Sequence, residues 1–133
     1  MGRAPREITE TELSLLNELW QRSSATVQEL TEALYSNTVP ALLATVRKLL
    51  DRLEAKGCVS RDRNQWPYQY SPVVKREDLA GNRLQAAADE LFDGELAPLL
   101  THLVRSRKLT AKDRENLRKV FDELDREDKG KGK

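Results

Sequence analysis

The sequence predicts a mainly α-helical protein that contains one small β-ribbon. Apolar residues recur at helical spacing up to Lys56, at alternate positions in the stretch that ends at Tyr70, and at helical spacing again after Pro72. The chain has 133 residues, of which 38% are hydrophobic and 34% are charged. That length accommodates one domain with a small additional region, and the many periodic leucines favour a folded protein over a disordered one.

A strong start signal opens the first predicted helix. Thr9 and Glu12 have the spacing of a capping box, in which each side chain bonds the backbone N–H of the other residue. Ile8 and Leu13 are placed to close a hydrophobic staple over the same turn. Two serines at 23 and 24 end the apolar stripe of this helix, which consists of Leu13, Leu16, Leu19 and Trp20.

Two more helices complete the first part of the chain. Thr26 and Glu29 form a second predicted capping box, which starts a short amphipathic helix ending near Tyr35. The third helix is predicted from Pro40 to Lys56, because proline is tolerated in a first turn and the following glycine suits a left-handed C-terminal residue. Its apolar stripe consists of Leu42, Val46, Leu49, Leu50 and Leu53.

The period then changes to that of strands. Residues 58–63 and 66–70 are predicted as two short strands around Asn64-Gln65, with Trp66, Tyr68 and Tyr70 on a common face. A proline at 67 favours an edge position for the second strand. Three helices followed by a two-stranded ribbon form the winged helix-turn-helix arrangement.

The C-terminal part is predicted to be helical over residues 79–92, 96–104 and 110–124. These helices are too few and too thinly apolar to bury their stripes alone, so we expect a homodimer formed mainly through residues 75–127. The side chains expected at the dimer interface are Leu84, Leu91, Phe92, Leu96, Leu99, Leu100, Leu103, Leu117, Val120, Phe121 and Leu124.

These patterns divide the chain into three parts. Residues 1–73 are the expected winged helix-turn-helix domain, 74–128 the helical dimerisation region, and 129–133 a disordered basic tail. The charge is unevenly distributed, although the formal net charge is only +1. Residues 1–35 carry three basic and six acidic side chains, whereas residues 36–72 carry six basic and three acidic ones. The basic middle suits an anionic partner.

One face of the third helix is slender and cationic. At about 100° per residue, Thr45, Lys48 and Arg52 fall together and away from the leucine stripe. Such a face is usually only solvated, but its place directly before a basic ribbon favours contact with DNA. The predicted DNA contacts are Ala41, Ala44, Thr45, Arg47, Lys48 and Arg52 on this helix, and Arg61, Arg63 and Trp66 on the ribbon.

Several motifs resemble those of a known family. The stretch ATVRKLLDRLEAKG, from Ala44 to Gly57, has Thr-Val, Leu, Arg-Leu and Lys-Gly at the spacing of a recognition-helix signature. YQYSP, which ends at Pro72, resembles a wing-closing strand, and TETEL from Thr9 with the later Trp20 also fits. Together they resemble the penicillinase repressor (BlaI/MecI/CopY) family over nearly the whole chain, the C-terminal half mainly in its pattern.

The resemblance implies a sequence-specific transcriptional repressor. It would act as a homodimer on a palindromic operator in double-stranded DNA, with the third helix of each subunit in a major groove. In the resistance branch of the family, a membrane-bound sensor protease acts upstream and the repressor is cut in its dimerisation region. In the copper branch, metal binding releases the DNA.

Four features depart from the family pattern. Ala44 replaces the usual lysine, which removes a phosphate contact, and Gln65-Trp66 replaces the usual Gly-Arg of the wing. The Asn-Phe cleavage junction of the resistance branch falls near Thr101-His102, which is the candidate cleavage region, and the absence of Asn-Phe there argues against protease-coupled induction. The paired Cys-x-Cys sequences of the copper branch are absent from the sequence, which argues against copper sensing.

Two other functions remain open. A winged-helix module that binds a protein partner should expose aliphatic or aromatic residues on the third helix, whereas this chain has Thr45, Lys48 and Arg52 there. A winged-helix regulator of another family that senses a small ligand directly is the second alternative.

Catalysis is not expected. His102 and Cys58 are the only residues of their types and lie in different halves of the chain, so they predict neither a metal site nor a nucleophile–base pair. We therefore expect no enzyme activity, metal or cofactor. Because no stretch approaches ~18 apolar residues, we expect a cytoplasmic protein without membrane insertion.

Overall fold

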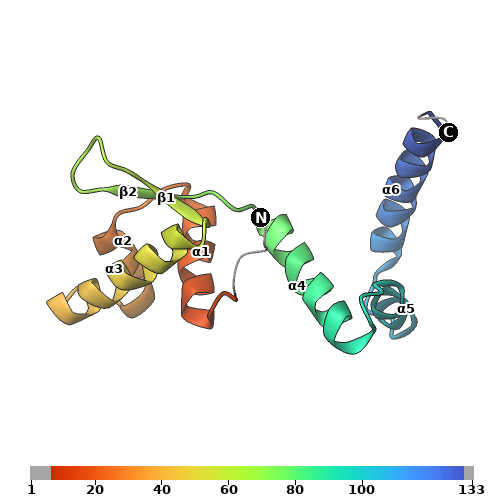
Figure 1. Cartoon of the computed structure of the whole chain (residues 1–133), viewed down its shortest axis with the longest axis horizontal. Helices are drawn as coiled ribbons and strands as arrows, with labels where there is room; N and C mark the ends of the chain where they lie inside the picture. The colour runs from red at the N-terminus through yellow and green to blue at the C-terminus, as the bar shows by residue number, and fades with distance from the viewer. Residues whose placement is uncertain (1–6, 131–133) are drawn as a thin grey trace. The chain divides into compact units, whose positions relative to one another are not determined.

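The computed structural model describes residues 7–130, which divide into two compact units, one up to Asn82 and one from Arg83 onward. The first unit holds three helices, a two-stranded sheet and the start of a fourth helix (Figure 1). The elements are α1 (Glu10–Arg22), α2 (Val27–Tyr35), α3 (Pro40–Ala55), β1 (Val59–Asp62), β2 (Gln69–Pro72), α4 (Arg76–Leu91), α5 (Ala97–Arg105) and α6 (Ala111–Gly130).

The predicted capping boxes are present and fix where α1 and α2 begin. The Thr9 hydroxyl accepts a hydrogen bond from the Glu12 N–H at 3.1 Å, and the Glu12 carboxylate accepts one from the Thr9 N–H at 3.0 Å. Thr26 and Glu29 repeat this geometry at 3.1 and 2.9 Å. The reciprocal bonds satisfy N–H groups that a helix start leaves without a partner, so the local sequence determines both starts.

The core of the first unit lies between α1, α2, α3 and the sheet. Leu15 is fully buried, although the predicted stripe of α1 omitted it, and Leu13 is only half-buried. This difference arises because α1 contacts α2, α3 and β2 and therefore buries a wider face than a single stripe. The fully buried aliphatic side chains of the three helices are Leu15, Leu16, Leu19, Leu30, Val46, Leu50 and Leu53.

The start of α4 belongs to this core. Leu79 is buried against it, and the Trp20 indole donates a hydrogen bond to the Val74 carbonyl at 3.0 Å. The Arg76 guanidinium carbon lies 5.1 Å from the centre of the Trp20 ring. The first unit therefore extends beyond the ribbon and includes the first turns of α4.

The ribbon is antiparallel, and its second strand begins later than predicted. β2 spans Gln69–Pro72, so Trp66 and Pro67 lie in the loop between the strands. Tyr70 is buried and exchanges backbone hydrogen bonds of 3.0 and 2.8 Å with Ala25, a residue far away in the sequence. This long-range pairing sets the strand. Trp66 is 77% exposed and lies before the strand, but its ring still contacts that of Tyr68, and Trp66, Tyr68 and Tyr70 line the same cleft.

The second unit has almost no interior of its own. Among the described residues from Arg83 onward, Ala88 is the one buried side chain. α6 starts at a third box, between Thr110 and Asp113, with bonds of 3.1 and 3.0 Å. It continues to Gly130, so two residues of the stretch expected to be disordered are helical, and residues 131–133 lie outside the described part. Most of the large apolar side chains of α5 and α6 are exposed within this unit.

Candidate nucleic-acid interface

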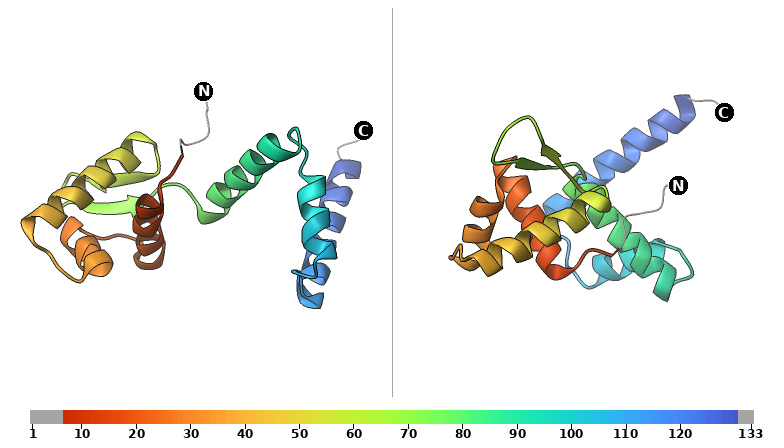
Figure 2. Two further views of the ribbon diagram at one scale, coloured as in Figure 1. Left: turned by 90° about the horizontal axis from the view of Figure 1, so that it is seen from below. Right: turned by 60° about the vertical axis from the view of Figure 1, so that its left-hand side comes forward.

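α3 presents two opposite faces, one to the core and one to solvent (Figures 1 and 2). Its C-terminal end is defined by Gly57, whose φ of 78° lies in the left-handed region that favours glycine. The Thr45 hydroxyl donates to the Ala41 carbonyl at 3.1 Å. The predicted contact residues of this helix, which are Ala41, Ala44, Thr45, Arg47, Lys48 and Arg52, are all exposed.

An open cleft of about 1050 Å³ lies beside α3 in the first unit. α2 forms one wall, and α3 together with the ribbon forms the other. Arg47 and Arg61 face it from the second wall, while Glu29 and Glu32 face it from α2. The loop between β1 and β2 projects past this region (Figure 1 and the right-hand view of Figure 2). Residues of α2, of α3 and of the ribbon therefore line one cleft, and the last two elements are those predicted to contact DNA.

Arg61 is held inside the unit, unlike the other predicted wing contacts. Its Nη2 lies 3.1 Å from a Glu54 carboxylate oxygen, and its guanidinium carbon lies 5.2 Å from the Tyr68 ring centre and 5.9 Å from that of Tyr70. Burial disfavours the charged guanidinium, but the electrostatic interactions with Tyr70, Glu54 and Asp51 and the hydrogen bond to Glu54 outweigh it and raise the pKa of Arg61. The Arg61 side chain is only 18% exposed.

The tip of the wing is more open. Arg63 is 61% exposed, with its Nη2 3.6 Å from the other Glu54 oxygen. The Trp66 ring stands edge-on to Tyr68, with 4.9 Å between ring centres. Asp62 braces the turn because its carboxylate accepts bonds of 2.9 Å from both the Asn64 N–H and the Gln65 amide. These bonds lower the pKa of Asp62, and the bond from the Asn64 N–H has the larger effect.

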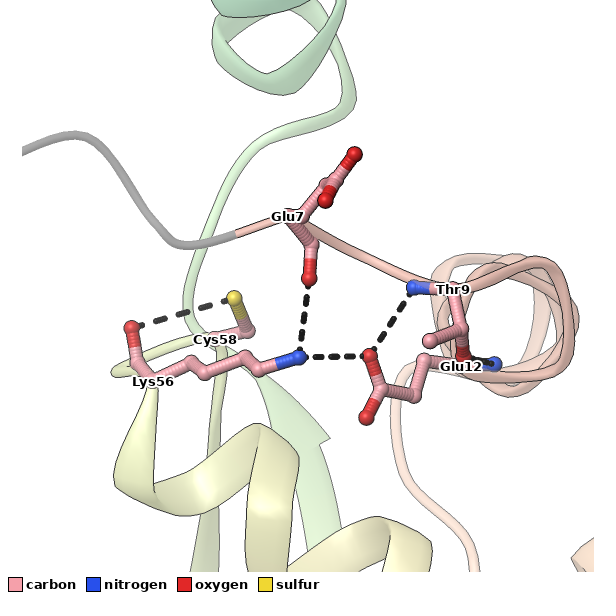
Figure 3. Close-up of polar contacts among 5 residues, drawn as sticks. All are labelled: Glu7, Thr9, Glu12, Lys56 and Cys58. Carbon is pink, nitrogen blue, oxygen red and sulfur yellow. Dashed lines mark hydrogen bonds and ion pairs between the residues drawn. The ribbon is translucent and has the colours of Figure 1, made fainter.

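A buried ion pair fixes the C-terminal end of α3 to the start of α1 (Figure 3). The fully buried Glu12 carboxylate lies 2.7 Å from the Lys56 ammonium, which also donates to the Glu7 carbonyl at 2.9 Å. Burial raises the pKa of Glu12, but the Lys56 bond, the Thr9 N–H and the charges of Lys56 and Arg52 lower it below 4.5 overall. Sequence reasoning missed this pair, because nothing local connects residues 44 positions apart.

Cys58 lies buried between the C-terminal end of α3 and the start of β1. Its thiol is buried, donates weakly to the Lys56 carbonyl over 3.9 Å, and has a pKa raised mainly by burial (Figure 3). Sequence reasoning also missed Glu54 and Asp51 as partners of the wing. The signal that could have found them is a pair of acids on the last turns of a helix that the basic ribbon follows directly.

Comparison with known proteins identifies the family. The pattern of the penicillinase repressor family matches residues 8–123 of this chain. The chain belongs to the penicillinase repressor family. It is accordingly a DNA-binding transcriptional repressor, which agrees with the winged-helix arrangement of the first unit.

The relatives of this repressor are distant but similar over most of their length. The penicillinase repressor of Staphylococcus aureus is 23% identical over 126 residues, covering 93% of this chain and 98% of that protein. The transcriptional regulator BlaI of Mycobacterium tuberculosis is 31% identical over 116 residues, covering 86% and 82%.

Solved structures also match. The DNA-binding domain of the repressor BlaI in solution is 25% identical, with a TM-score of 0.48, and covers 59% of this chain and 93% of that chain. A MarR family protein from Bacillus stearothermophilus is 22% identical, with a TM-score of 0.47, and covers 90% and 76%.

The other predicted site residues of the repressor lie in or near the second unit. Thr101 and His102 are exposed on α5, and the His102 carbonyl accepts the Ser106 N–H at 2.9 Å. Within residues 7–130, no three His, Cys, Asp or Glu residues gather as metal ligands, and no helix has the length and apolar character needed to cross a membrane. Most residues predicted at the dimer interface are exposed, while Leu99 and Leu103 are half-buried.

Proposed function

We propose that this repressor acts as a homodimer on a palindromic operator, with α3 of each subunit in a major groove. The observation that carries the proposal is the exposed, slender, cationic face of α3. Beside it, Arg47 lines an open cleft of about 1050 Å³ together with the wing residues Arg61 and Trp66. A helix with small side chains at its N-terminal half approaches base edges closely, and cations farther along reach guanine acceptors or phosphates.

Each exposed residue of that face has a role in the proposal. Thr45 contacts a base edge or a thymine methyl group, and Lys48 and Arg52 bind guanine acceptors or phosphates. Arg47, which lines the cleft, binds the phosphate backbone beside the groove. Ala41 and Ala44 allow a close approach.

The wing is proposed to contact the backbone or the minor groove through Arg63 and Trp66. Both side chains are mostly exposed, and an arginine with an amphipathic aromatic ring suits such contacts. Arg61 has a different position, because its guanidinium faces Glu54 and two tyrosine rings. We therefore assign Arg61 to the support of the wing.

The second unit is proposed to form the dimer. It buries almost nothing alone, and its exposed apolar side chains include Leu91 on α4, Leu100 on α5, and Val120 and Phe121 on α6. A second copy would cover the same face by twofold symmetry, in which each patch meets its own equivalent. Two half-sites about one helical turn apart would then be bound together.

An upstream sensor protease remains a prediction from the family resemblance. Thr101 and His102 are accessible, but both lie within the helical hydrogen bonding of α5. A protease would therefore act on them after local opening of α5, which the almost coreless second unit favours.

Selection of bound fragments from random double-stranded DNA tests the proposed function. We expect an enriched palindrome whose half-sites are separated by about 10 base pairs or a multiple of that spacing. Enrichment of a single, non-repeated half-site would contradict the dimer, and no enrichment at low ionic strength would contradict sequence-specific binding.

A further inference from the structure

A carboxylate on α3 connects the predicted reading helix to the wing. Glu54 lies on the last turn of α3 and faces two arginines of the ribbon, with a distance of 3.1 Å to Arg61 Nη2 and 3.6 Å to Arg63 Nη2. Asp51, one turn earlier, also acts electrostatically on Arg61. Both acids belong to the helix that is proposed to enter the negatively charged groove.

The contacts continue from Arg61 to the tip of the wing. The Arg61 guanidinium lies over the rings of Tyr68 and Tyr70, and the Tyr68 ring meets Trp66 edge-on. Tyr70 is buried and paired with Ala25, so one side of this stack is fixed to the core. A continuous set of packed side chains therefore runs from α3 to the exposed Trp66.

Arg61 is poorly placed to leave this stack and bind a phosphate. It is largely covered, and its Nε is buried without a hydrogen-bond partner among the described residues. Pulling it out would leave Glu54 without its closer partner and uncover two aromatic rings. Arg63 has no such restraint, because more than half of it is exposed and its ion pair is longer.

We infer that Glu54 is a positioning residue that, through Arg61, holds the wing in a fixed place relative to α3, so that both elements meet the operator together. The inference rests on the proposed DNA-binding function. It predicts an effect opposite in sign to simple electrostatics, because removing a carboxylate near DNA reduces repulsion and should otherwise strengthen binding. Glu54 is instead needed for affinity.

The first test compares Glu54→Gln with Glu32→Gln in operator binding by the full-length protein. Glu32 lines the cleft near the wing and forms no ion pair with another described residue, so it is a control for the loss of one charge. We expect Glu54→Gln to weaken binding about 3- to 10-fold, and Glu32→Gln to leave it unchanged or strengthen it slightly. Equal or tighter binding by Glu54→Gln would overturn the inference.

A double-mutant cycle tests whether Glu54 acts through Arg61. Glu54→Gln should cost little further affinity in a protein that already carries Arg61→Gln, because the connection is then already broken. If the affinity losses of the two single variants simply add in the double variant, Glu54 does not act through Arg61. Arg61→Lys, which keeps the charge but not the planar stacking, provides a second variant if either substitution impairs folding.

A third measurement reads the wing in the absence of DNA. The two tryptophans give separate indole N–H signals by NMR, and a Trp66→Phe variant assigns them. Glu54→Gln should shift or broaden the Trp66 signal and leave that of Trp20, which is bonded to the Val74 carbonyl, in place. An unchanged Trp66 signal would contradict this inference but not the proposed DNA-binding function. The proposed function would fail separately, if the wild-type protein showed no preference for any DNA sequence.

Discussion

Two carboxylates of different burial hold the last turns of α3. Glu12 is fully buried and bonds Lys56 on the core side, whereas the partly exposed Glu54 meets Arg61 on the wing side. The first pair joins α3 to α1, and the second joins α3 to the ribbon. The end of α3 is thus connected by ion pairs both to α1 and to the ribbon.

Lys48→Ala and Arg52→Ala should each weaken operator binding without unfolding the protein, since both side chains are exposed. A lost base contact should cost about 1–3 kcal/mol of binding free energy, and a lost phosphate contact should reduce the salt slope by about one. Gel-shift titrations at several salt concentrations measure both effects. Lys112→Ala on α6 is the control, and unchanged affinity in both test variants would reject the assigned face.

Lys56→Met should destabilise the protein strongly, because it leaves the Glu12 carboxylate buried without its cation. Removing one partner of such a pair costs about 3 kcal/mol of the free energy of unfolding. Urea denaturation at neutral pH measures this loss. Lys75→Met, an exposed lysine after β2, is the control, and an equally small effect in both variants would show that the Glu12–Lys56 pair contributes little.

The same pair predicts a pH dependence. Burial opposes ionisation, but Lys56, the Thr9 N–H and Arg52 lower the pKa of Glu12 below 4.5 in the folded state. The unfolded state therefore binds this proton more readily, so the stabilisation is present above pH 4.5 and is lost as the pH falls through the lower folded value. The difference in unfolding free energy between wild type and Glu12→Gln should shrink on acidification. A difference that stays constant with pH would contradict this account.

At the scale of elements, starts and ends of helices follow local chemistry. The ends of α3 and α4 illustrate this, since each is followed by glycine with positive φ, namely Gly57 at 78° and Gly94 at 88°. The second strand does not follow local chemistry, because the alternating aromatics predicted it from residue 66 whereas pairing of Tyr70 with Ala25 moves it to Gln69–Pro72. The helix starts set by capping boxes and the glycine stop of α3 were therefore predictable from sequence, whereas the far end of α6 and the strand register were not.

Two glycine substitutions should have opposite effects. Gly57→Ala should lower the free energy of unfolding by about 1 kcal/mol, because an L side chain is strained at its positive φ. Gly81→Ala, in the middle of α4, should raise it by about 0.5–1 kcal/mol through better helix propensity. An added Cβ meets nothing within 4 Å at either site, so packing does not confuse the comparison. Thermal and urea unfolding measure both, and equal effects would contradict the backbone explanation.

At the scale of the whole molecule, the two units differ in how they gain stability. The unit up to Asn82 encloses a core of leucines and aromatics, whereas the unit from Arg83 onward buries only Ala88 among its described residues. Hydrophobic burial is the main favourable term in folding, so the second unit is expected to be stable mainly in contact with another copy.

Phe121→Asp should dissociate the proposed dimer. The Phe121 ring is exposed on the apolar stripe of α6, and an aspartate there would be an unpaired charge in the interface. Lys119→Asp places the same residue on the opposite, polar side of α6 and is the control. Sedimentation should show a monomer for Phe121→Asp and a dimer for the control, with operator binding weakened in parallel. A Phe121→Asp protein that still sediments as a dimer would exclude this stripe from the interface.

Local sequence was enough to predict the order of helices and ribbon, the capping boxes of α1 and α2, the glycine stop after α3 and the exposed face with Thr45, Lys48 and Arg52. Each of these depends on residues within a few positions of one another, where backbone geometry and helical periodicity decide. The strand register, the Glu12–Lys56 pair and the enclosure of Arg61 by Glu54 and two tyrosines became visible only in the folded chain. Those features join distant segments, and chain proximity comes from packing of the whole core rather than from local preference.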